Sequence, residues 1–431
     1  MLSAIVGSLI TVIATIFSVT IVTLQLASSQ YSPRLLQRFM SDRLVQIVLG
    51  TYAATFVYAI LVLRIVRAPG TASGAFNPLV SVPVALVLAL ISVALLVYFI
   101  HHIANMSQSS SIVQAVHDDG VRAISRLETL EELEEDREPN PEDEAPDRKT
   151  GAPSVMVLAE KSGYARSVEE RSLLKALADK EGTFFAEFPL APGAYVTAGL
   201  PAVKLWFSED ERLSPEEERL VERSIVVGPE RTMLQDPTFS IRQLSDIALK
   251  GLSPGINDPT TAVQALNSTG SMFVALGSRR VPRRLTEHES DGRRRLVCIG
   301  YPSFEEVVAM AFDQVRRAAF TSGQVAVLKK IIDVVERALA ANEIPERREA
   351  LWNRVYLLAR QSTYQIPDSH DAIDLCCRAV AVGASLLHTG LRRQVVSDLK
   401  DLADLCDEVP DGGRVREEVS SLVKAPERDF G

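Results

Sequence analysis

The sequence lacks the common signatures of catalysis and nucleotide binding. Its 431 residues contain no G-x-x-x-x-G-K-[ST] phosphate loop, no G-x-G-x-x-G turn after a strand, no G-x-S-x-G nucleophile elbow and no H-E-x-x-H zinc pair. The six histidines are scattered along the chain, and the acidic run Glu216–Glu218 belongs to a solvated helix start. We therefore expect a protein that is not an enzyme and that binds no cofactor or metal.

Cysteine and clustered basic charge are also scarce. The four cysteines include no C-x-x-C pair and have no neighbouring histidine, so they predict reduced thiols and not a zinc site: Cys298, Cys376, Cys377 and Cys406. Reduced thiols are typical of a reducing compartment. The net charge of −9 argues against a nucleic-acid partner, because phosphates are neutralised by clustered lysine and arginine.

Charge is nearly absent from the first hundred residues, although charged residues make up 23% of the whole chain. Three apolar stretches, about residues 3–26, 44–66 and 79–100, each reach the roughly 20 residues that a membrane-spanning helix requires. The first stretch lacks the basic start of a signal peptide and is too long for one. The sequence therefore predicts an integral membrane protein with three spanning helices in residues 1–102.

The arginines of the short loops predict the orientation of these helices. The loop after the first stretch holds Arg34, Arg38 and Arg43, whereas the next loop offers only Arg64 and Arg67. This bias places the first loop and the whole C-terminal region in the cytoplasm. The N-terminus of the chain would then face outward.

Hydroxyl and small side chains form a stripe about 100° wide on the first apolar stretch when it is drawn as a helix. The stripe consists of Gly7, Ser8, Thr11, Thr15, Ser18, Gln25 and Ser29. Such a face in hydrocarbon is explained either by close packing of helices through small residues or by a water-filled path lined by hydroxyls. The spans contain no Asp, Glu or Lys, which argues against an ion carrier with a charged relay.

The rest of the sequence predicts a mainly α-helical protein with one small β-rich part. Residues 103–130 continue the helical pattern, and residues 131–152 have the acidic, proline-containing composition of a disordered linker. Short strands separated by glycine and proline turns predict a β-rich subdomain at 153–228. Amphipathic stretches predict a helical cytoplasmic domain at 229–431.

Two helix starts in this domain share the pattern Asp-Pro-Thr, beginning at Asp236 and Asp258, with aspartate as the cap and proline in the first turn. Asn257 and Asp258 either simply cap the second helix or help its free N–H groups to hold an anion. Residues 279–295 hold seven arginines. We interpret them as a solvated hairpin paired with acidic neighbours or, alternatively, as a contact for anionic lipid or a small anion.

Two segments of the chain resemble a known family. The first runs from Leu24 to Leu36, and the second combines Gln235–Phe239 with Leu252–Ala262, which contains the specific run Ser-Pro-Gly-Ile-Asn-Asp-Pro. Together they resemble the bacterial membrane-protein family catalogued as domain of unknown function 2254, over essentially the whole chain. The resemblance marks a candidate site made of the family-motif residues Ser32, Pro33, Arg34, Ser253, Pro254, Gly255, Asn257 and Asp258.

The resemblance also has consequences for topology. It implies a location in the bacterial inner (plasma) membrane. Members of the family are usually described with a further hydrophobic segment upstream of the one that starts at Ser3. An upstream helix missing from this sequence would return the N-terminus to the cytoplasm.

These features favour an oligomeric channel or pore-like protein with a cytoplasmic regulatory domain, because three spans are too few to enclose a path within one chain. The alternative is a membrane-anchored scaffold or sensor that binds protein partners through its helical domain. The expected partners are membrane lipid and further copies of the chain, without nucleic acid. No motif specifies a small ligand or ion.

Overall fold

The structure is a computed structural model that describes residues 2–30, 42–67, 80–106, 108–125, 127, 153–180, 183–208, 212–233, 235–279, 284–290 and 293–424. The chain divides into two compact units, Met1–Ile112 and Val113–Gly431, and each is described by itself. The acidic linker predicted at 131–152 lies outside the described residues, as do the candidate site residues Ser32, Pro33 and Arg34.

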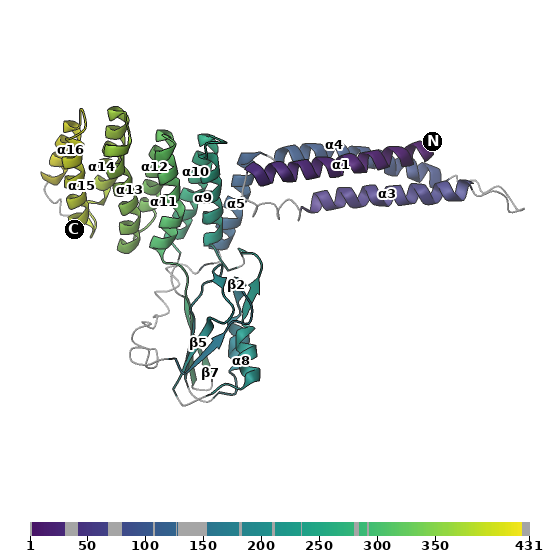
Figure 1. Cartoon of the computed structure of the whole chain (residues 1–431), viewed down its shortest axis with the longest axis horizontal. Helices are drawn as coiled ribbons and strands as arrows, with labels where there is room; N and C mark the ends of the chain where they lie inside the picture. Colours follow the sequence, from purple (N-terminus) through teal and green to yellow (C-terminus); the bar gives the residue numbers. More distant parts are fainter. Residues whose placement is uncertain are drawn as a thin grey trace, which may run out of the picture. The chain divides into compact units, whose positions relative to one another are not determined.

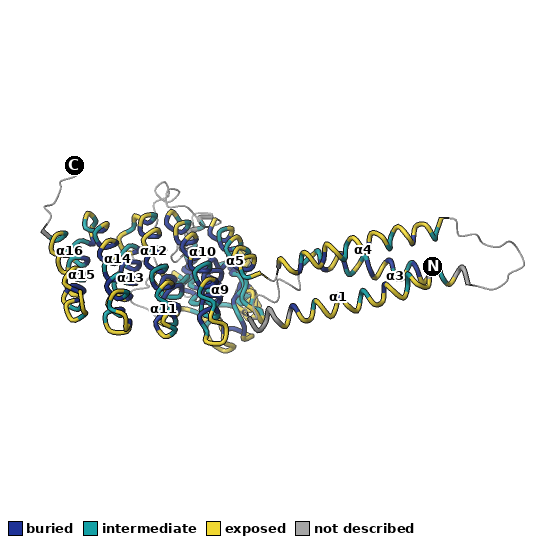
Figure 2. Tube along the Cα trace, turned by 90° about the horizontal axis from the view of Figure 1, so that it is seen from above, coloured by how far each residue is buried: buried dark blue, intermediate teal, exposed yellow. Residues whose placement is uncertain are grey.

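Three long apolar helices make up the first unit: α1 (Leu2–Gln30), α3 (Arg43–Arg67) and α4 (Ser81–Met106). Each contains a segment that is long and apolar enough to cross a membrane, namely Ser3–Thr23, Arg43–Arg64 and Ser81–Asn105. The prediction of three spanning helices is therefore confirmed for the described residues. Most of the surface of these helices is exposed, whereas the helices of the second unit are buried along their inner faces (Figure 2).

The spanning helices pack through an apolar core and are joined by a few polar contacts. The hydroxyl of Tyr52 on α3 donates to the carbonyl oxygen of Ser92 on α4 at 2.6 Å, and both residues are buried. Asp42 caps the start of α3 by accepting from the amide of Leu44 at 2.8 Å, and its other oxygen lies 3.2 Å from Nε2 of His102 on α4. Since hydrocarbon offers no water, such internal partners are needed for each polar group.

The second unit contains four helical hairpins among its described residues, and they stack side by side in two layers (Figure 1). One layer holds the first helix of each hairpin: α9 (Thr238–Gly251), α11 (Phe304–Thr321), α13 (Pro345–Gln365) and α15 (Arg392–Cys406). The other layer holds the second helix of each: α10 (Pro259–Gly277), α12 (Val325–Ala340), α14 (Ser369–Leu386) and α16 (Gly413–Lys424). The helix α5 (Ser109–Ile124) packs against the first hairpin.

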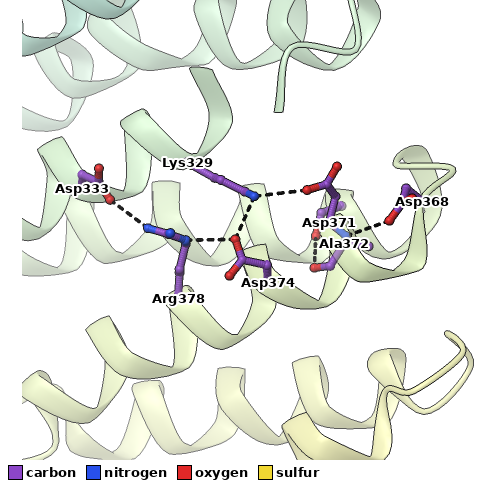
Figure 3. Close-up of polar contacts among 8 residues, drawn as sticks. Lys329, Asp333, Asp368, Asp371, Ala372, Asp374 and Arg378 are labelled. Atoms are coloured by element: carbon purple, nitrogen blue, oxygen red, sulfur yellow. Dashed lines mark hydrogen bonds and ion pairs between the residues drawn. The ribbon is translucent and has the colours of Figure 1, made fainter. Parts of the chain in front are cut away.

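Charged side chains link neighbouring hairpins across the second layer (Figure 3). Lys329 on α12 lies 3.1 Å from Asp371 and 2.9 Å from Asp374 on α14, and Arg378 on α14 lies 3.3 Å from Asp333 on α12. These pairs are partly exposed, so each contributes little stability. Their regular spacing shows that α12 and α14 run in the same direction, as expected when hairpins stack.

Two small sheets and two short helices make up the β-rich part. The larger sheet has the order β1 (Val155–Leu158), β5 (Pro201–Phe207), β3 (Phe184–Phe188), β8 (Arg293–Ile299) and β7 (Arg284–Ser290). The smaller sheet has the order β4 (Tyr195–Val196), β2 (Gly163–Val168) and β6 (Ile225–Gly228). The helices are α7 (Glu170–Ala176) and α8 (Pro215–Glu222). The two sheets share one apolar core, which includes Phe184, Phe188 and Val203.

The expectation that the chain is helical from residue 229 onward is wrong for residues 284–299. Strands β7 and β8 form a hairpin there, and β8 pairs in parallel with β3, so that Phe184 lies opposite Arg295 and Phe188 opposite Ile299. The run Leu296–Ile299 is buried because this strand lies inside the sheet between two neighbours. Four of the seven arginines between residues 279 and 295 therefore belong to these strands.

Candidate functional site

The stripe predicted on α1 lies on a face that neither α3 nor α4 covers. Six residues of the stripe are exposed: Gly7, Ser8, Thr11, Thr15, Ser18 and Gln25. The side chain of Ser29 lies outside the described part of the structure. A different face of α1 is buried in the helix bundle through Leu9 and Ile16. Packing of the stripe within the described part of this unit is thereby excluded as its explanation.

The hydroxyls of the stripe donate to the backbone of their own helix. Ser8 donates to the carbonyl oxygen of Ile5 at 2.9 Å, Thr11 to that of Gly7 at 3.2 Å and Thr15 to that of Thr11 at 2.9 Å. A hydroxyl that donates in this way keeps its oxygen as an acceptor. The stripe therefore tolerates hydrocarbon but still offers acceptors to water, an ion or another helix.

A third face of α1 is exposed and apolar. It carries Ile10, Phe17 and Ile21, which at 100° per residue lie well outside the hydroxyl stripe. The uncovered surface of α1 is thus divided into two chemically different faces. Lipid chains match the apolar face, whereas the hydroxyl face suits a protein or aqueous neighbour better.

The second candidate site, the described family-motif residues, forms the loop between α9 and α10. Pro254, Gly255 and Asn257 are exposed, and Asn257 adopts a left-handed backbone conformation with φ 48°. The loop is closed by backbone hydrogen bonds from Asn257 to Ser253 at 2.9 Å and from Asp258 to Gly251 at 2.7 Å. The structure therefore brings these residues together as one ordered turn.

Asp258 is confirmed as the cap of α10. Its carboxylate accepts from the amide of Thr261 at 3.0 Å and from the hydroxyl of Thr261 at 2.6 Å. These hydrogen bonds from Thr261 hold the pKa of Asp258 below its ordinary value. The side chain is thus engaged in capping, and its geometry supports the capping interpretation of Asn257 and Asp258.

We expect Asp258→Ala to cost about 1 kcal/mol of stability at neutral pH, because it removes the cap. Since the pKa is lowered on folding, the contribution of Asp258 is fully present above the unfolded value of about 3.9 and is lost as the pH falls through the lower folded value. Melting temperatures of the two proteins in detergent should therefore differ at pH 7 and converge below about pH 4. Thr260→Ala, in the same turn but exposed, is the control; an equal loss in that variant would contradict the assignment.

Sequence reasoning missed the role of the first motif, Gln235–Phe239, which joins the sheets to the helices. The side-chain amide of Gln235 pairs with the backbone of Val168 on β2, accepting from its amide at 2.8 Å and donating to its carbonyl at 3.1 Å. Asp236 is buried, contacts the guanidinium of Arg231 and accepts from the hydroxyl of Thr238 at 2.7 Å. The prediction that Asp236 is the cap of the helix is wrong, because α9 begins at Thr238 and its cap position is Pro237.

The cysteines are placed as structural thiols. Cys298, Cys376 and Cys406 are buried, and Cys377 is half-buried. A hydrogen bond with Cys376, together with burial, raises the pKa of the Cys406 thiol. Across the part of the chain that the structure describes, no group of three or more His, Cys, Asp or Glu side chains is placed to hold a metal ion.

The fold and these two sites define a membrane protein with three spanning helices, a small sheet region and a helical domain. Over residues 1–337 the chain matches the family described as predicted membrane protein (DUF2254), and it belongs to that family. It is 32% identical over 388 residues to the uncharacterized protein Rv1290c of Mycobacterium tuberculosis and to the uncharacterized protein Mb1321c of Mycobacterium bovis, alignments that cover 88% of this chain and 70% of each relative. No solved structure matches the chain significantly. The last two hairpins, α13 to α16, lie beyond residues 1–337, the segment that matches the family.

Proposed function

We propose that the chain is an oligomeric, pore-like protein of the bacterial plasma membrane, with a cytoplasmic C-terminal region that regulates it. The observation that supports this proposal is the exposed hydroxyl face of α1, which points away from Leu9 and Ile16 in the bundle core. Three spans cannot enclose a path alone. Several copies that turn this face inward would surround one.

The chemistry of the face suits a path for small ions or polar solutes. Thr11, Thr15 and Ser18 lie near the middle of the span Ser3–Thr23, where the barrier for a polar solute is highest. Hydroxyl oxygens at this depth replace part of the hydration shell of a passing solute. The apolar face with Ile10, Phe17 and Ile21 would remain toward lipid.

The proposal is tested with purified protein reconstituted into liposomes. We expect the protein to cross-link as an oligomer in the membrane and to release trapped potassium or chloride, as reported by ion-sensitive dyes. Thr15→Leu places an apolar side chain in the middle of the stripe. Flux should then fall to that of empty liposomes while cross-linking is unchanged.

The matched control is Ile21→Phe, which adds bulk on the apolar exposed face of the same helix. This variant should keep its flux. A wild-type protein that is monomeric and passes no ions would remove the pore proposal. Loss of flux in both variants would assign the effect of Thr15→Leu to general disturbance of α1.

The second candidate function is a membrane-anchored scaffold, and the stack of four hairpins favours it. Stacked helical hairpins present long continuous surfaces, which is how repeat proteins bind extended partners. In this case the spans would serve only as an anchor, and the stripe would pack copies together. Flux that is lost in Thr15→Leu with intact assembly would exclude a purely anchoring role.

A further inference from the structure

Two buried thiols from neighbouring hairpins meet at the end of the helical stack. Cys376 belongs to α14 in the third hairpin, and Cys406 is the last residue of α15 in the fourth. Both side chains are fully buried, and a hydrogen bond joins their thiols. Residues 377–405 separate them in sequence, so the contact is made by the packing of α15 on α14.

The surroundings of the two thiols make them chemically different. The hydrogen bond from Cys406 lowers the pKa of the Cys376 thiol, and Oγ of Ser362 on α13 lies 3.7 Å from Sγ of Cys376. The same hydrogen bond, together with burial, raises the pKa of Cys406. Since the thiolate is the nucleophile in thiol oxidation, Cys376 is the sulfur that attacks an oxidant. Cys406 keeps its proton and lies in place to attack second.

The position of the pair in the last hairpin determines which oxidants can reach it. The helices α15 and α16 pack against α13 and α14 and lie at the C-terminal end of the row of hairpins (Figure 1). Elements at the end of a stack open locally at a lower free-energy cost than those in its middle. Hydrogen peroxide is little larger than water, so a small opening of the last hairpin admits it to the buried thiols.

We propose that Cys376 and Cys406 form a disulfide in response to hydrogen peroxide and that this bond fastens the fourth hairpin to the third. The Cys376 thiolate attacks one oxygen of the peroxide: an S–O bond forms, the O–O bond breaks, and the leaving hydroxide takes up the proton that Cys376 released. Sγ of Cys406 then attacks Sγ of the resulting sulfenic acid: the S–S bond forms, the S–O bond breaks, and a second water leaves with the proton of Cys406. The two thiols lose two electrons, which reduce the peroxide to two waters.

The disulfide would act on the stability of the end of the stack. It closes a covalent loop over residues 377–405, which restricts the opened states of the last hairpin. This hairpin lies beyond residues 1–337, so the response belongs to a part of the chain outside the family match. The proposal does not depend on the pore function, because it requires no ion flux.

The test treats the purified full chain in detergent with increasing amounts of hydrogen peroxide, blocks the remaining thiols and maps linked peptides by mass spectrometry. We expect a peptide that joins residue 376 to residue 406 and that a reducing agent separates. Met156, which is 54% exposed, shows in the same spectra how far oxidation of the surface has gone. In the oxidised protein, the backbone amides of residues 401–414 should exchange their hydrogens at least about tenfold more slowly, because the disulfide opposes opening of the last hairpin.

The adjacent Cys377 gives the matched control, because it is only half-buried. Cys377→Ser should keep both the linked peptide and the slower exchange, whereas Cys376→Ser should lose both. The proposal is overturned if Cys377→Ser yields no linked peptide by the time Met156 is fully oxidised. It is equally overturned if the linked peptide forms and the exchange of residues 401–414 is unchanged. Both decisive results come from a protein that keeps the buried pair intact, so they do not require a substitution of Cys376 or Cys406 to fold.

Discussion

Replacement of Arg347 by alanine is expected to destabilise the helical stack by about 3 kcal/mol, because each hydrogen bond to a buried charged group contributes about 1.5–3 kcal/mol. Arg347 on α13 is 6% exposed. Its guanidinium donates to carbonyl oxygens at the end of α10, to Leu276 at 3.0 Å and to Arg279 at 2.8 Å. It also lies over the ring of Phe304, 5.1 Å from the ring centre.

The position of Arg347 explains why the loss should be large. The last carbonyls of a helix have no partner within the helix and carry its negative dipole end. The guanidinium of Arg347, on α13 of the third hairpin, donates to the carbonyls at the end of α10 in the first hairpin. Arg347 therefore links two elements that are distant in sequence. Alanine removes this donor from the carbonyls of Leu276 and Arg279, of which Leu276 still accepts from the amide of Arg279 at 3.0 Å, and opens a cavity beside Phe304. Burial lowers the pKa of Arg347, but a guanidinium remains charged in proteins.

The two tryptophans make this prediction measurable. Trp352 is buried in the same helix as Arg347, whereas Trp206 belongs to the sheet region. In a Trp206→Phe background, thermal unfolding followed by Trp352 fluorescence reports the helices alone. For a unit of this size, a loss of 3 kcal/mol corresponds to a fall in melting temperature of about 6–12 °C.

Two comparisons separate the helix-end contact from general effects of mutation. Arg347→Lys keeps the charge but not the planar fork, so it should recover only part of the stability. Arg360→Ala removes an exposed arginine from the same helix and should change stability by less than about 0.5 kcal/mol. If Arg347→Ala and Arg360→Ala melt alike, the helix-end role of Arg347 is wrong.

Local structure in this chain could be predicted where the signal is itself local. The capping box of Ser303 and Glu306 begins α11 through residues three positions apart, and the strand Val155–Leu158 lies in the predicted β-rich part at 153–228. Uncharged runs of sufficient length gave the three spans. In each case, the residues that decide the structure lie within a few positions of one another.

Long-range pairing could not be predicted in the same way. The strand β8 has an apolar half, but its arginine-rich start resembles a solvated turn, and its partner β3 lies more than a hundred residues earlier. Nothing local in the sequence distinguishes Arg347 from the adjacent Arg348, because the carbonyls that it contacts are about seventy residues away. For the candidate stripe, periodicity predicted one face of α1, and only the packing of α3 and α4 revealed that the face is left uncovered.

Replacement of Asp236 by alanine should cost about 3 kcal/mol, the lower end of the loss for a buried ion pair, because Asp236 is buried and Arg231 only half-buried. Asp236 is 2% exposed and contacts the guanidinium of Arg231, and its other oxygen accepts from the amide of Thr238 at 3.2 Å. Gly193, between strands β3 and β4, approaches so closely that a Cβ atom there would collide with the Asp236 carboxylate. Alanine at residue 236 therefore leaves the half-buried Arg231 without its anion and opens a gap where the sheets meet the helices.

Because Asp236 lies at this junction, its loss should be felt on both sides. We expect unfolding followed by Trp206, in a Trp352→Phe background, and unfolding followed by Trp352, in the Trp206→Phe background, both to shift to lower temperature. Asp236→Asn keeps the shape and one acceptor oxygen, so it should lie between wild type and alanine. The control is Asp246→Ala, which removes a partly exposed carboxylate paired with Arg242 at 3.3 Å and should cost less than about 1 kcal/mol. A shift confined to the Trp352 signal would show that Asp236 stabilises α9 but does not join the sheets to the helices.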